Sequence, residues 1–301
     1  MEFRLLGPIE AVRDDRSIPL GGAKPRALLA LLLLHAGEVV SRDRLIEAVW
    51  PGRPSGSAEH SLDVQVSRLR KAFAPDEFLL TRSGGYVLEV EPDAVDATRF
   101  ERLLDKGRRA NAAGDPADGL RSLEPALALW RGQALAEVAY EDFARADAER
   151  LEELRLVATE ERIDAELALG RHDPLIAELE ALTARHPLRE RLRGQLMLAL
   201  YRAGRQAEAL RVYSDTRNRL VDELGIEPGQ ALRELEQAVL RQDPVLDLPP
   251  RGRTPSRRRG LLVGTGALVL AAAAVALVVG LTQGSTEGAH ACGRCSPRRW
   301  G

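Results

Sequence analysis

The spacing of apolar residues changes several times in the first 92 residues, and each change predicts an element. Segments in which apolar and polar residues alternate predict strands, and apolar residues that recur every three or four positions predict helices. In chain order these elements are predicted at 3–6, 9–12, 17–20, 25–34, 42–49, 58–71, 79–81 and 86–90. Three strands, three helices and a final hairpin form a winged helix-turn-helix domain, which we assign to residues 1–92.

Individual residues support these boundaries. Pro25 stands at the start of a helix in which Ala27 to Leu34 are all apolar, a run typical of a buried core helix and too short to cross a membrane. Ser41 is a good N-cap for the second helix, and Trp50 at its end is expected to anchor the core. Gly84-Gly85 predicts the turn of the hairpin.

The third predicted helix is the candidate recognition helix. Leu62, Val66 and Leu69 recur at helical spacing and are expected to face the core. The residues offset from this stripe can face outward or flank the core, and we select them as candidate DNA contacts: His60, Ser61, Gln65, Ser67, Arg68, Arg70 and Lys71. Arginine pairs with guanine and glutamine with adenine through two hydrogen bonds each, so these residue types suit the major groove.

Arg70 and Lys71 suit phosphate contacts, and Arg82 beside the hairpin turn could enter the neighbouring minor groove. An alternative stays open, because the acidic residues Asp63, Asp76 and Glu77 lie in the same region and could pair with the basic ones as an ordinary solvated surface. His60 could equally contact phosphate or have a capping or surface role.

From residue 96 onward the pattern is helical throughout. Helices are predicted at 96–113, 116–130, 143–169, 174–185, 189–203, 206–224 and 229–241. Gly170 and Gly204 lie 34 residues apart and each precedes an arginine, which is the period of tetratricopeptide repeats. We therefore predict an all-α, tetratricopeptide-like domain over residues 93–243; an unrelated helical bundle with coincident glycines is the alternative. The fold class is mainly α.

Charge narrows the choice of partners only weakly. The chain has a net charge of −2, and its first 92 residues hold 12 Lys and Arg against 13 Asp and Glu. DNA contact must therefore come from a local patch instead of an overall basic domain. The sequence contains no glycine-rich phosphate loop, nucleophile motif or clustered metal ligands before residue 243, so we expect no enzyme, cofactor or metal site.

The C-terminal segment predicts a membrane anchor. Residues 244–259 form a linker rich in Pro and Arg, and the 22 residues from Gly260 to Leu281 carry no charge. At about 1.5 Å per residue such a helix is long enough to cross a hydrocarbon core. Five arginines precede it and three follow at a greater distance, which predicts cytoplasmic N-terminal domains at the cell membrane and a short outer tail at 282–301. No signal peptide is expected.

Both cysteines lie in this tail. Cys292 and Cys295 form a CxxC pattern, with His290 nearby. The pattern is compatible with a disulfide, a redox switch or half of a metal site, and also with an unstructured tail in which the cysteines are incidental.

Several longer motifs resemble known domains. SLDVQVSRLRKAF (61–73) and TRSGGYVL (81–88) resemble the winged helix of OmpR-type response regulators. ALALWRGQALAEV (126–138), AELALGRH (165–172), HPLRERLRGQLMLALYRAGRQAEALRVY (186–213) and DELGIEPG (222–229) resemble the bacterial transcriptional activator domain. In this order the two domains resemble the Streptomyces antibiotic regulatory protein family over about residues 1–243.

The resemblance implies a dimer that binds direct repeats in double-stranded DNA upstream of promoters and recruits RNA polymerase, usually to activate specialised-metabolite genes. Gln65, Ser67, Arg68, Arg70 and Arg82 match DNA-contacting positions of the wider class, although Ser67 stands where many relatives have a basic residue. We expect neither a receiver domain nor the nucleotide-binding domain of larger members. The anchor resembles the layout of membrane-bound winged-helix regulators.

The leading hypothesis is therefore a membrane-anchored transcriptional activator. The alternative is a membrane-tethered adaptor that binds proteins through its helical repeats. An adaptor would not need the basic residues on the recognition helix and hairpin, which favours the regulator.

Overall fold

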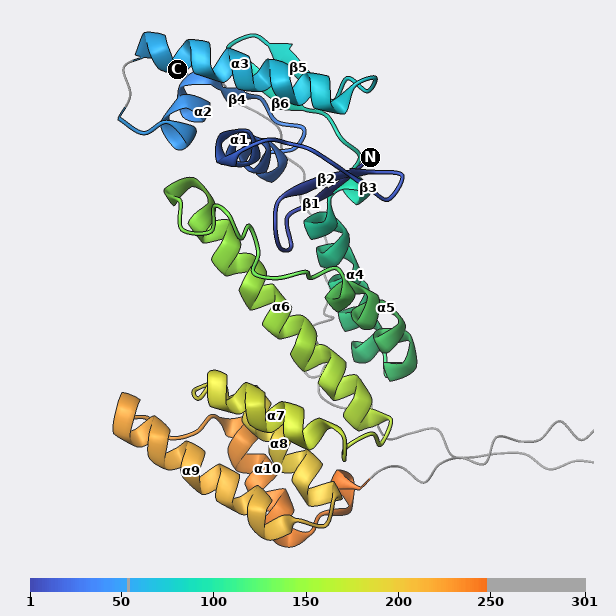
Figure 1. Cartoon of the computed structure of the whole chain (residues 1–301). Helices are drawn as coiled ribbons and strands as arrows, with labels where there is room; N and C mark the ends of the chain where they lie inside the picture. The colour runs from blue at the N-terminus through green and yellow to red at the C-terminus, as the bar shows by residue number, and fades with distance from the viewer. Residues whose placement is uncertain (53–54, 248–301) are drawn as a thin grey trace, which may run out of the picture. The chain divides into compact units, whose positions relative to one another are not determined.

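The computed structural model describes residues 1–52 and 55–247, and its first elements are those of a winged helix (Figure 1). The strands β1, β2 and β3 form an antiparallel sheet in that order, and a second sheet has the order β4-β6-β5. The elements are β1 Glu2–Arg4, β2 Glu10–Arg13, β3 Arg16–Ile18, α1 Ala23–Leu34, β4 Val40–Ser41, α2 Arg42–Val49, α3 Ser55–Phe73, β5 Leu79–Arg82 and β6 Gly85–Leu88. The predicted order of strands, helices and hairpin is thus confirmed.

Local chemistry explains most of these boundaries. The apolar run of α1 places seven residues in the core, Ala27 to Leu33, and the Ser41 hydroxyl accepts a hydrogen bond from the Arg44 amide, as expected of an N-cap. Strand β4 was not predicted, because two residues are too few to show alternation. The hairpin turn also differs: Gly85 already belongs to β6, so the turn falls at Ser83 and Gly84.

The second half of the described chain is helical, with short 3-10 segments at its two ends. Its elements are η1 Pro92–Ala94, α4 Asp96–Ala112, α5 Pro116–Ala128, α6 Asp142–Ala168, α7 Leu175–Arg185, α8 Glu190–Arg202, α9 Gln206–Leu224, α10 Gln230–Arg241 and η2 Pro244–Leu246. Among residues 1–52 and 55–247 no helix is both long and apolar enough to cross a membrane. The predicted span from Gly260 to Leu281 and the Cys292/Cys295 pair lie outside the described residues.

Three helices end in the same way. Gly114, Gly170 and Gly204 follow α4, α6 and α8 and have positive φ of 78°, 79° and 75°, a conformation that glycine adopts without steric cost. The amide after each glycine donates to the carbonyl five residues earlier, which is the Schellman cap. The predicted repeat therefore corresponds to a recurring helix ending.

Two hydrophobic clusters divide the described chain, and the long helix α6 contributes to both. The first extends from Phe3 to Ala158 and the second from Ile163 to Leu246. Between the last α6 residue of one and the first of the other lie two buried carboxylates, Glu160 and Glu161. The boundary between the clusters is therefore polar.

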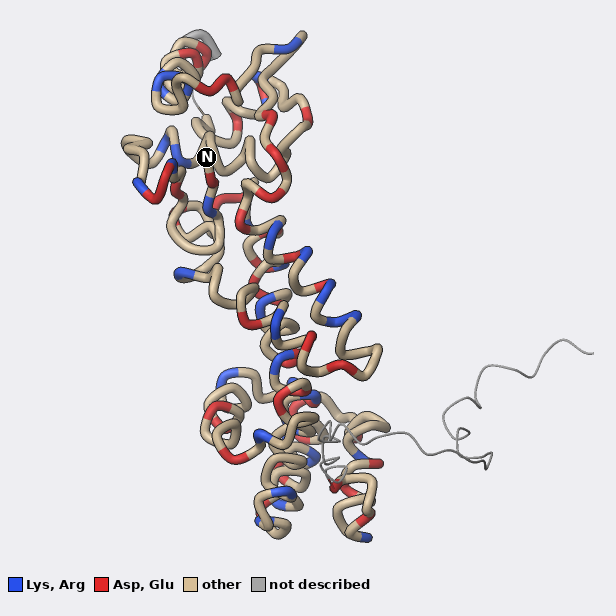
Figure 2. The backbone as a smooth tube through the Cα atoms, turned by 90° about the vertical axis from the view of Figure 1, so that its right-hand side faces the viewer, with Lys and Arg blue, Asp and Glu red and all other residues tan. Residues whose placement is uncertain are grey.

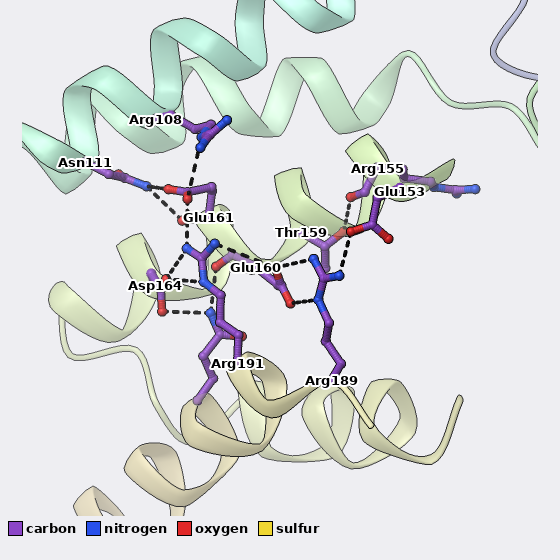
Figure 3. A network of polar contacts seen from close by, with 11 residues as sticks. Arg108, Asn111, Glu153, Arg155, Thr159, Glu160, Glu161, Asp164, Arg189 and Arg191 are labelled. Atoms are coloured by element: carbon purple, nitrogen blue, oxygen red, sulfur yellow. Dashed lines mark hydrogen bonds and ion pairs between the residues drawn. The ribbon is translucent and has the colours of Figure 1, made fainter. Parts of the chain in front are cut away.

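Arginines at the start of α8 neutralise these carboxylates (Figure 3). Arg189 donates to both oxygens of Glu160 at 2.8 and 3.1 Å, and this pairing raises the pKa of the guanidinium. Arg191 donates to Glu161 at 2.8 Å and to Asp164 at 2.6 Å. From α4, Asn111 donates to Glu161 at 3.0 Å, so the network links three helices.

The winged helix and the helical part both contribute to the first cluster, and a buried carboxylate joins them there. Asp96, the first residue of α4, is 1% exposed and accepts hydrogen bonds from the Leu5 amide at 2.7 Å and the Leu6 amide at 3.1 Å. The carbonyls of the same two residues accept from the amides of Leu135 and Arg131, each at 2.8 Å. The segment after β1 is therefore bonded on both sides by the helical part.

This attachment explains one difference from the prediction. Helix α5 was predicted to reach residue 130 but ends at Ala128. The following loop uses its amides to bond Leu5 and Leu6, while the Trp130 ring packs edge-on against Phe100 with centroids 5.3 Å apart. Contacts distant in sequence thus end the helix.

We expect Asp96→Ala to destabilise the fold strongly, because it leaves two buried amides without an acceptor at about 1–3 kcal/mol each. Urea unfolding measures the loss. Asp93→Ala, which removes an exposed ion pair with Arg102, is the matched control and should cost no more than about 1 kcal/mol. Equal losses for the two variants would contradict the role of Asp96.

The same carboxyl gives a pH dependence. Burial raises the pKa of Asp96 above its ordinary value of 3.8 despite the hydrogen bonds from Leu5 and Leu6. Its contribution to the free energy of unfolding is therefore complete below pH 3.8 and decreases as the pH rises through the pKa of the folded state. The difference in stability between the natural chain and Asp96→Ala should be larger at the acidic end of that range.

Candidate nucleic-acid interface

The candidate interface consists of α3 and the hairpin β5–β6, which pack against each other. The core face of α3 is formed by residues at helical spacing that are at most 2% exposed: Ala58, Leu62, Val66, Leu69 and Phe73. The predicted stripe of Leu62, Val66 and Leu69 is confirmed, and α3 extends it by one residue at each end. The ring of Phe73 packs edge-on against Phe3 with centroids 5.6 Å apart, which ties the end of α3 to β1.

The candidate contact residues occupy different positions around α3. His60, Ser67, Arg68, Arg70 and Lys71 are exposed, whereas Ser61 and Gln65 are half-buried at the edge of the core face. The spacing of His60, Ser67 and Lys71 places them opposite the core stripe. The Ser61 hydroxyl donates to the Ser57 carbonyl within the helix, and the enclosed Gln65 Oε1 has no hydrogen-bond partner among the described residues.

A three-residue network holds α3 against α2 and the hairpin. Arg42 of α2 contacts Asp63 of α3 at 2.8 Å and donates to the Tyr86 hydroxyl at 2.6 Å. That hydroxyl in turn donates to Asp63 at 2.9 Å. Burial alone would raise the pKa of Asp63, but the hydrogen bonds from Arg42 and Tyr86 outweigh it and lower the pKa. Asp63 is therefore charged and engaged within the domain.

Arg70 is also engaged within the domain, although its side chain is exposed. Its Nε donates to the Leu79 carbonyl at 2.9 Å, its Nη2 donates to the Thr81 hydroxyl at 2.8 Å, and its guanidinium lies 5.8 Å from the Tyr86 ring centroid. These contacts attach β5 to α3. In this conformation Arg70 positions the hairpin.

Arg68 and Lys71 differ from Arg70, because neither forms an ion pair or hydrogen bond with the described residues. Two of the three acidic residues that could have neutralised them are engaged elsewhere, Asp63 with Arg42 and Asp76 with Arg13, each at 2.8 Å, and the third, Glu77, is exposed and pairs with neither. Basic and acidic positions are interspersed along the described backbone (Figure 2), so this pair of free cations is a local feature. Both are available to an anionic partner.

Arg82 lies at the end of β5, next to the turn. It pairs with Glu89 at 2.8 Å, and both side chains are about half exposed, so the ion pair is weak and can be exchanged for another anion. Gly85 is the first residue of β6 and lies close to β4. A Cβ at this position would lie 2.0 Å from the Val40 carbonyl oxygen and would collide with it. The absence of that side chain allows the hairpin to pair with β4.

The sequence did not single out the residues that set this geometry. Arg42, Thr81 and Tyr86 position α3 and the hairpin, and Tyr86, the sole tyrosine in the first 92 residues, was the available signal. Among the described residues no three His, Cys, Asp or Glu side chains are grouped to hold a metal ion. The chemistry available here is electrostatic and hydrogen-bonding recognition of an anionic surface.

Comparisons with known proteins match both halves of the chain. Residues 16–88 match the family "Transcriptional regulatory protein, C terminal", and residues 95–240 match the "Bacterial transcriptional activator domain". The regulatory protein DnrI of Streptomyces peucetius is 38% identical over 257 residues, covering 82% of this chain and 94% of DnrI. AfsR of Streptomyces griseus is 45% identical over 83% of this chain, which spans only 25% of the length of AfsR.

A solved structure has the same fold. Mycobacterium tuberculosis EmbR, determined in complex with a low affinity phosphopeptide, superposes with a TM-score of 0.75 at 38% identity. The match covers 80% of this chain and 65% of the EmbR chain.

The bonded cation of α3, Arg70, and the two free ones, Arg68 and Lys71, should differ in how much each contributes to the free energy of unfolding without any ligand. Arg70→Ala removes charge-assisted hydrogen bonds to β5 and is expected to lower the free energy of unfolding by about 1.5–3 kcal/mol. Arg68→Ala and Lys71→Ala should stay within about 0.5 kcal/mol of the natural chain, because their exposed side chains form no hydrogen bond or ion pair with a described residue. Urea unfolding distinguishes these results, and an Arg68→Ala loss as large as that of Arg70→Ala would contradict the assignment.

Proposed function

Since the chain belongs to the Streptomyces antibiotic regulatory protein family, which is a family of transcriptional regulators and not of enzymes, we propose that it regulates transcription by binding specific sites in double-stranded DNA. Helix α3 enters the major groove and the hairpin β5–β6 approaches the neighbouring minor groove. The observation that carries the proposal is the pair of free cations, Arg68 and Lys71, on the solvent face of α3. Neither must break an internal ion pair to reach DNA.

The proposal assigns different tasks to these residues. Arg68 contacts base edges, since its guanidinium can form paired hydrogen bonds with a base, and Gln65 can do the same only after its enclosed amide rotates outward. Lys71, His60 and Ser67 face the sugar-phosphate backbone that borders the groove, and the Lys71 ammonium contacts a phosphate. Arg82 exchanges its exposed partner Glu89 for the minor groove, while Arg70 and Ser61 hold the geometry.

Further parts of the proposal rest on the family. The chain acts as a dimer on direct repeats and activates specialised-metabolite genes by recruiting RNA polymerase. Its similarity to the bacterial transcriptional activator domain over residues 95–240 and to DnrI over nearly the whole of that regulator supports this reading.

We also propose that the regulator is anchored in the cell membrane by a helix from Gly260 to Leu281, with its N-terminal domains in the cytoplasm. The support is the uncharged run of 22 residues and the five arginines immediately before it. The structure places the first residues of the predicted linker, Pro244–Leu246, in η2, so only the part of the linker after η2 would separate the DNA-binding part from the bilayer.

The DNA test begins with selection of bound fragments from a random double-stranded pool by the purified full chain. On the selected site Arg68→Ala should cost about 1–3 kcal/mol and relax the preference at one base pair. Lys71→Ala should weaken binding to all sequences and flatten the log–log salt dependence by about 0.9. Fluorescence anisotropy over a salt series gives both quantities.

The matched control is Lys106→Ala, which removes the same charge from an exposed position on α4 and should leave affinity and salt dependence unchanged. If the folded chain enriches no sequence, the DNA-binding proposal is wrong and the membrane-tethered adaptor becomes the better hypothesis. Loss of affinity in Lys106→Ala equal to that in Lys71→Ala would also argue against α3 as the contact.

The anchor is tested by fractionating cells that produce the full chain or a chain lacking residues 260–281. We expect the full chain in membranes after alkaline carbonate washing and the shortened chain in the soluble fraction. A phosphatase fused after residue 301, which is active only outside the cytoplasm, should be active. A carbonate-soluble full chain would exclude the anchor.

A further inference from the structure

A cavity of about 580 Å³ lies in the helical part, away from α3. It is bounded by the second half of α6, the first half of α8 and the start of α10. Its walls are mainly apolar, with side chains of Leu167, Leu198, Leu232 and Leu235. This volume falls within the range of sites that enclose small organic molecules.

The polar part of the wall includes two carboxylates. Asp164 lines the cavity from α6 and Glu190 from α8, together with a single cation, Arg191. Arg191 is already committed to Asp164 at 2.6 Å and to Glu161 at 2.8 Å (Figure 3). Glu190 accepts one hydrogen bond, from the Gly229 amide at 2.7 Å. The lining therefore carries an excess of negative charge and of hydrogen-bond acceptors.

Gln195 adds an acceptor without a partner. This residue lines the cavity and is 4% exposed. Its Nε2 donates to the Glu160 carbonyl at 2.8 Å and to Asp164 at 2.7 Å, which fixes the orientation of the amide. Its Oε1 is buried and accepts no hydrogen bond from any described residue. This oxygen is enclosed by the protein and is not itself open to the cavity.

We propose that this cavity binds a small amphipathic amine, with its apolar body among the four leucines and its ammonium group near Glu190 and Asp164. The excess of carboxylates favours a cation over an anion of the same shape. Asp164, Arg191 and Gln195 line the cavity and also belong to the polar network between the two hydrophobic clusters. The bound amine would therefore contact that network.

Gly194 provides a way to close the cavity without disturbing its polar wall. It lies in α8 with a negative φ, and a Cβ added there would make ordinary contacts of 3.6 and 3.7 Å with Leu235 and Leu232. A methyl group is therefore tolerated, whereas a leucine side chain would occupy the space of the ligand. Gly194→Ala is the matched control for Gly194→Leu.

The experiment is calorimetric titration of the purified full chain, without DNA, with three probes that share an indole body. Tryptamine carries an ammonium group, indole-3-propionate a carboxylate, and N-acetyltryptamine no charge. We expect tryptamine to bind about tenfold or more tightly than indole-3-propionate, since a charge-assisted hydrogen bond is worth at least one decade of affinity. Octylamine serves as a second cationic probe with a different apolar body.

Gly194→Leu should weaken tryptamine about tenfold or more, while Gly194→Ala should bind as the natural chain does. Glu190→Gln keeps an acceptor for the Gly229 amide but removes the charge, so it should weaken tryptamine selectively and leave N-acetyltryptamine unchanged. This variant tests the proposal even if Gly194→Leu does not fold. The proposal is overturned if neither amine binds at millimolar concentration, if the anion binds equally well, or if Glu190→Gln affects the charged and neutral probes alike.

Discussion

The buried carboxylate of Asp96 is the constraint on which the relation between DNA-binding and helical parts depends. It accepts the amides of Leu5 and Leu6 from the segment after β1, while the loop after α5 bonds their carbonyls. Buried backbone groups must be paired, so neither part can leave the other without exposing or orphaning these groups. A single hydrophobic cluster consequently extends from Phe3 to Ala158, and α3 is held in a defined relation to the first half of α6.

A different type of contact governs the second half of α6. Glu160 and Glu161 interrupt the apolar surface of that helix and are neutralised by Arg189 and Arg191 at the start of α8. Buried ion pairs of this type contribute little net stability compared with apolar packing, but the loss of one partner is costly. The network therefore fixes which surface of α8 meets α6 more than it strengthens the fold. The cavity proposed to bind an amine lies against this network.

At the candidate interface, the structure separates positioning cations from free ones. Arg68, Arg70 and Lys71 are close in sequence and chemically similar, yet Arg70 is bonded to β5 whereas the other two form no hydrogen bond or ion pair with a described residue. Tyr86 and Arg42 engage Asp63, the exposed acidic residue of α3 that lies nearest in sequence to Arg68. This internal neutralisation leaves the remaining positive charge available for a partner, although the first 92 residues are not basic as a whole.

The sequence by itself determined the elements whose signals are local. The apolar run of α1, the Ser41 cap, the stripe of Leu62, Val66 and Leu69 and the glycines that end helices depend on neighbours a few residues away, and they were predicted close to their observed positions. Strand β4, the early end of α5, the place of Arg70 and the cavity beside Gln195 depend on groups brought together from distant parts of the chain. Only the tertiary structure could decide these features, because periodicity shows which face of an element is buried and not which residue it meets.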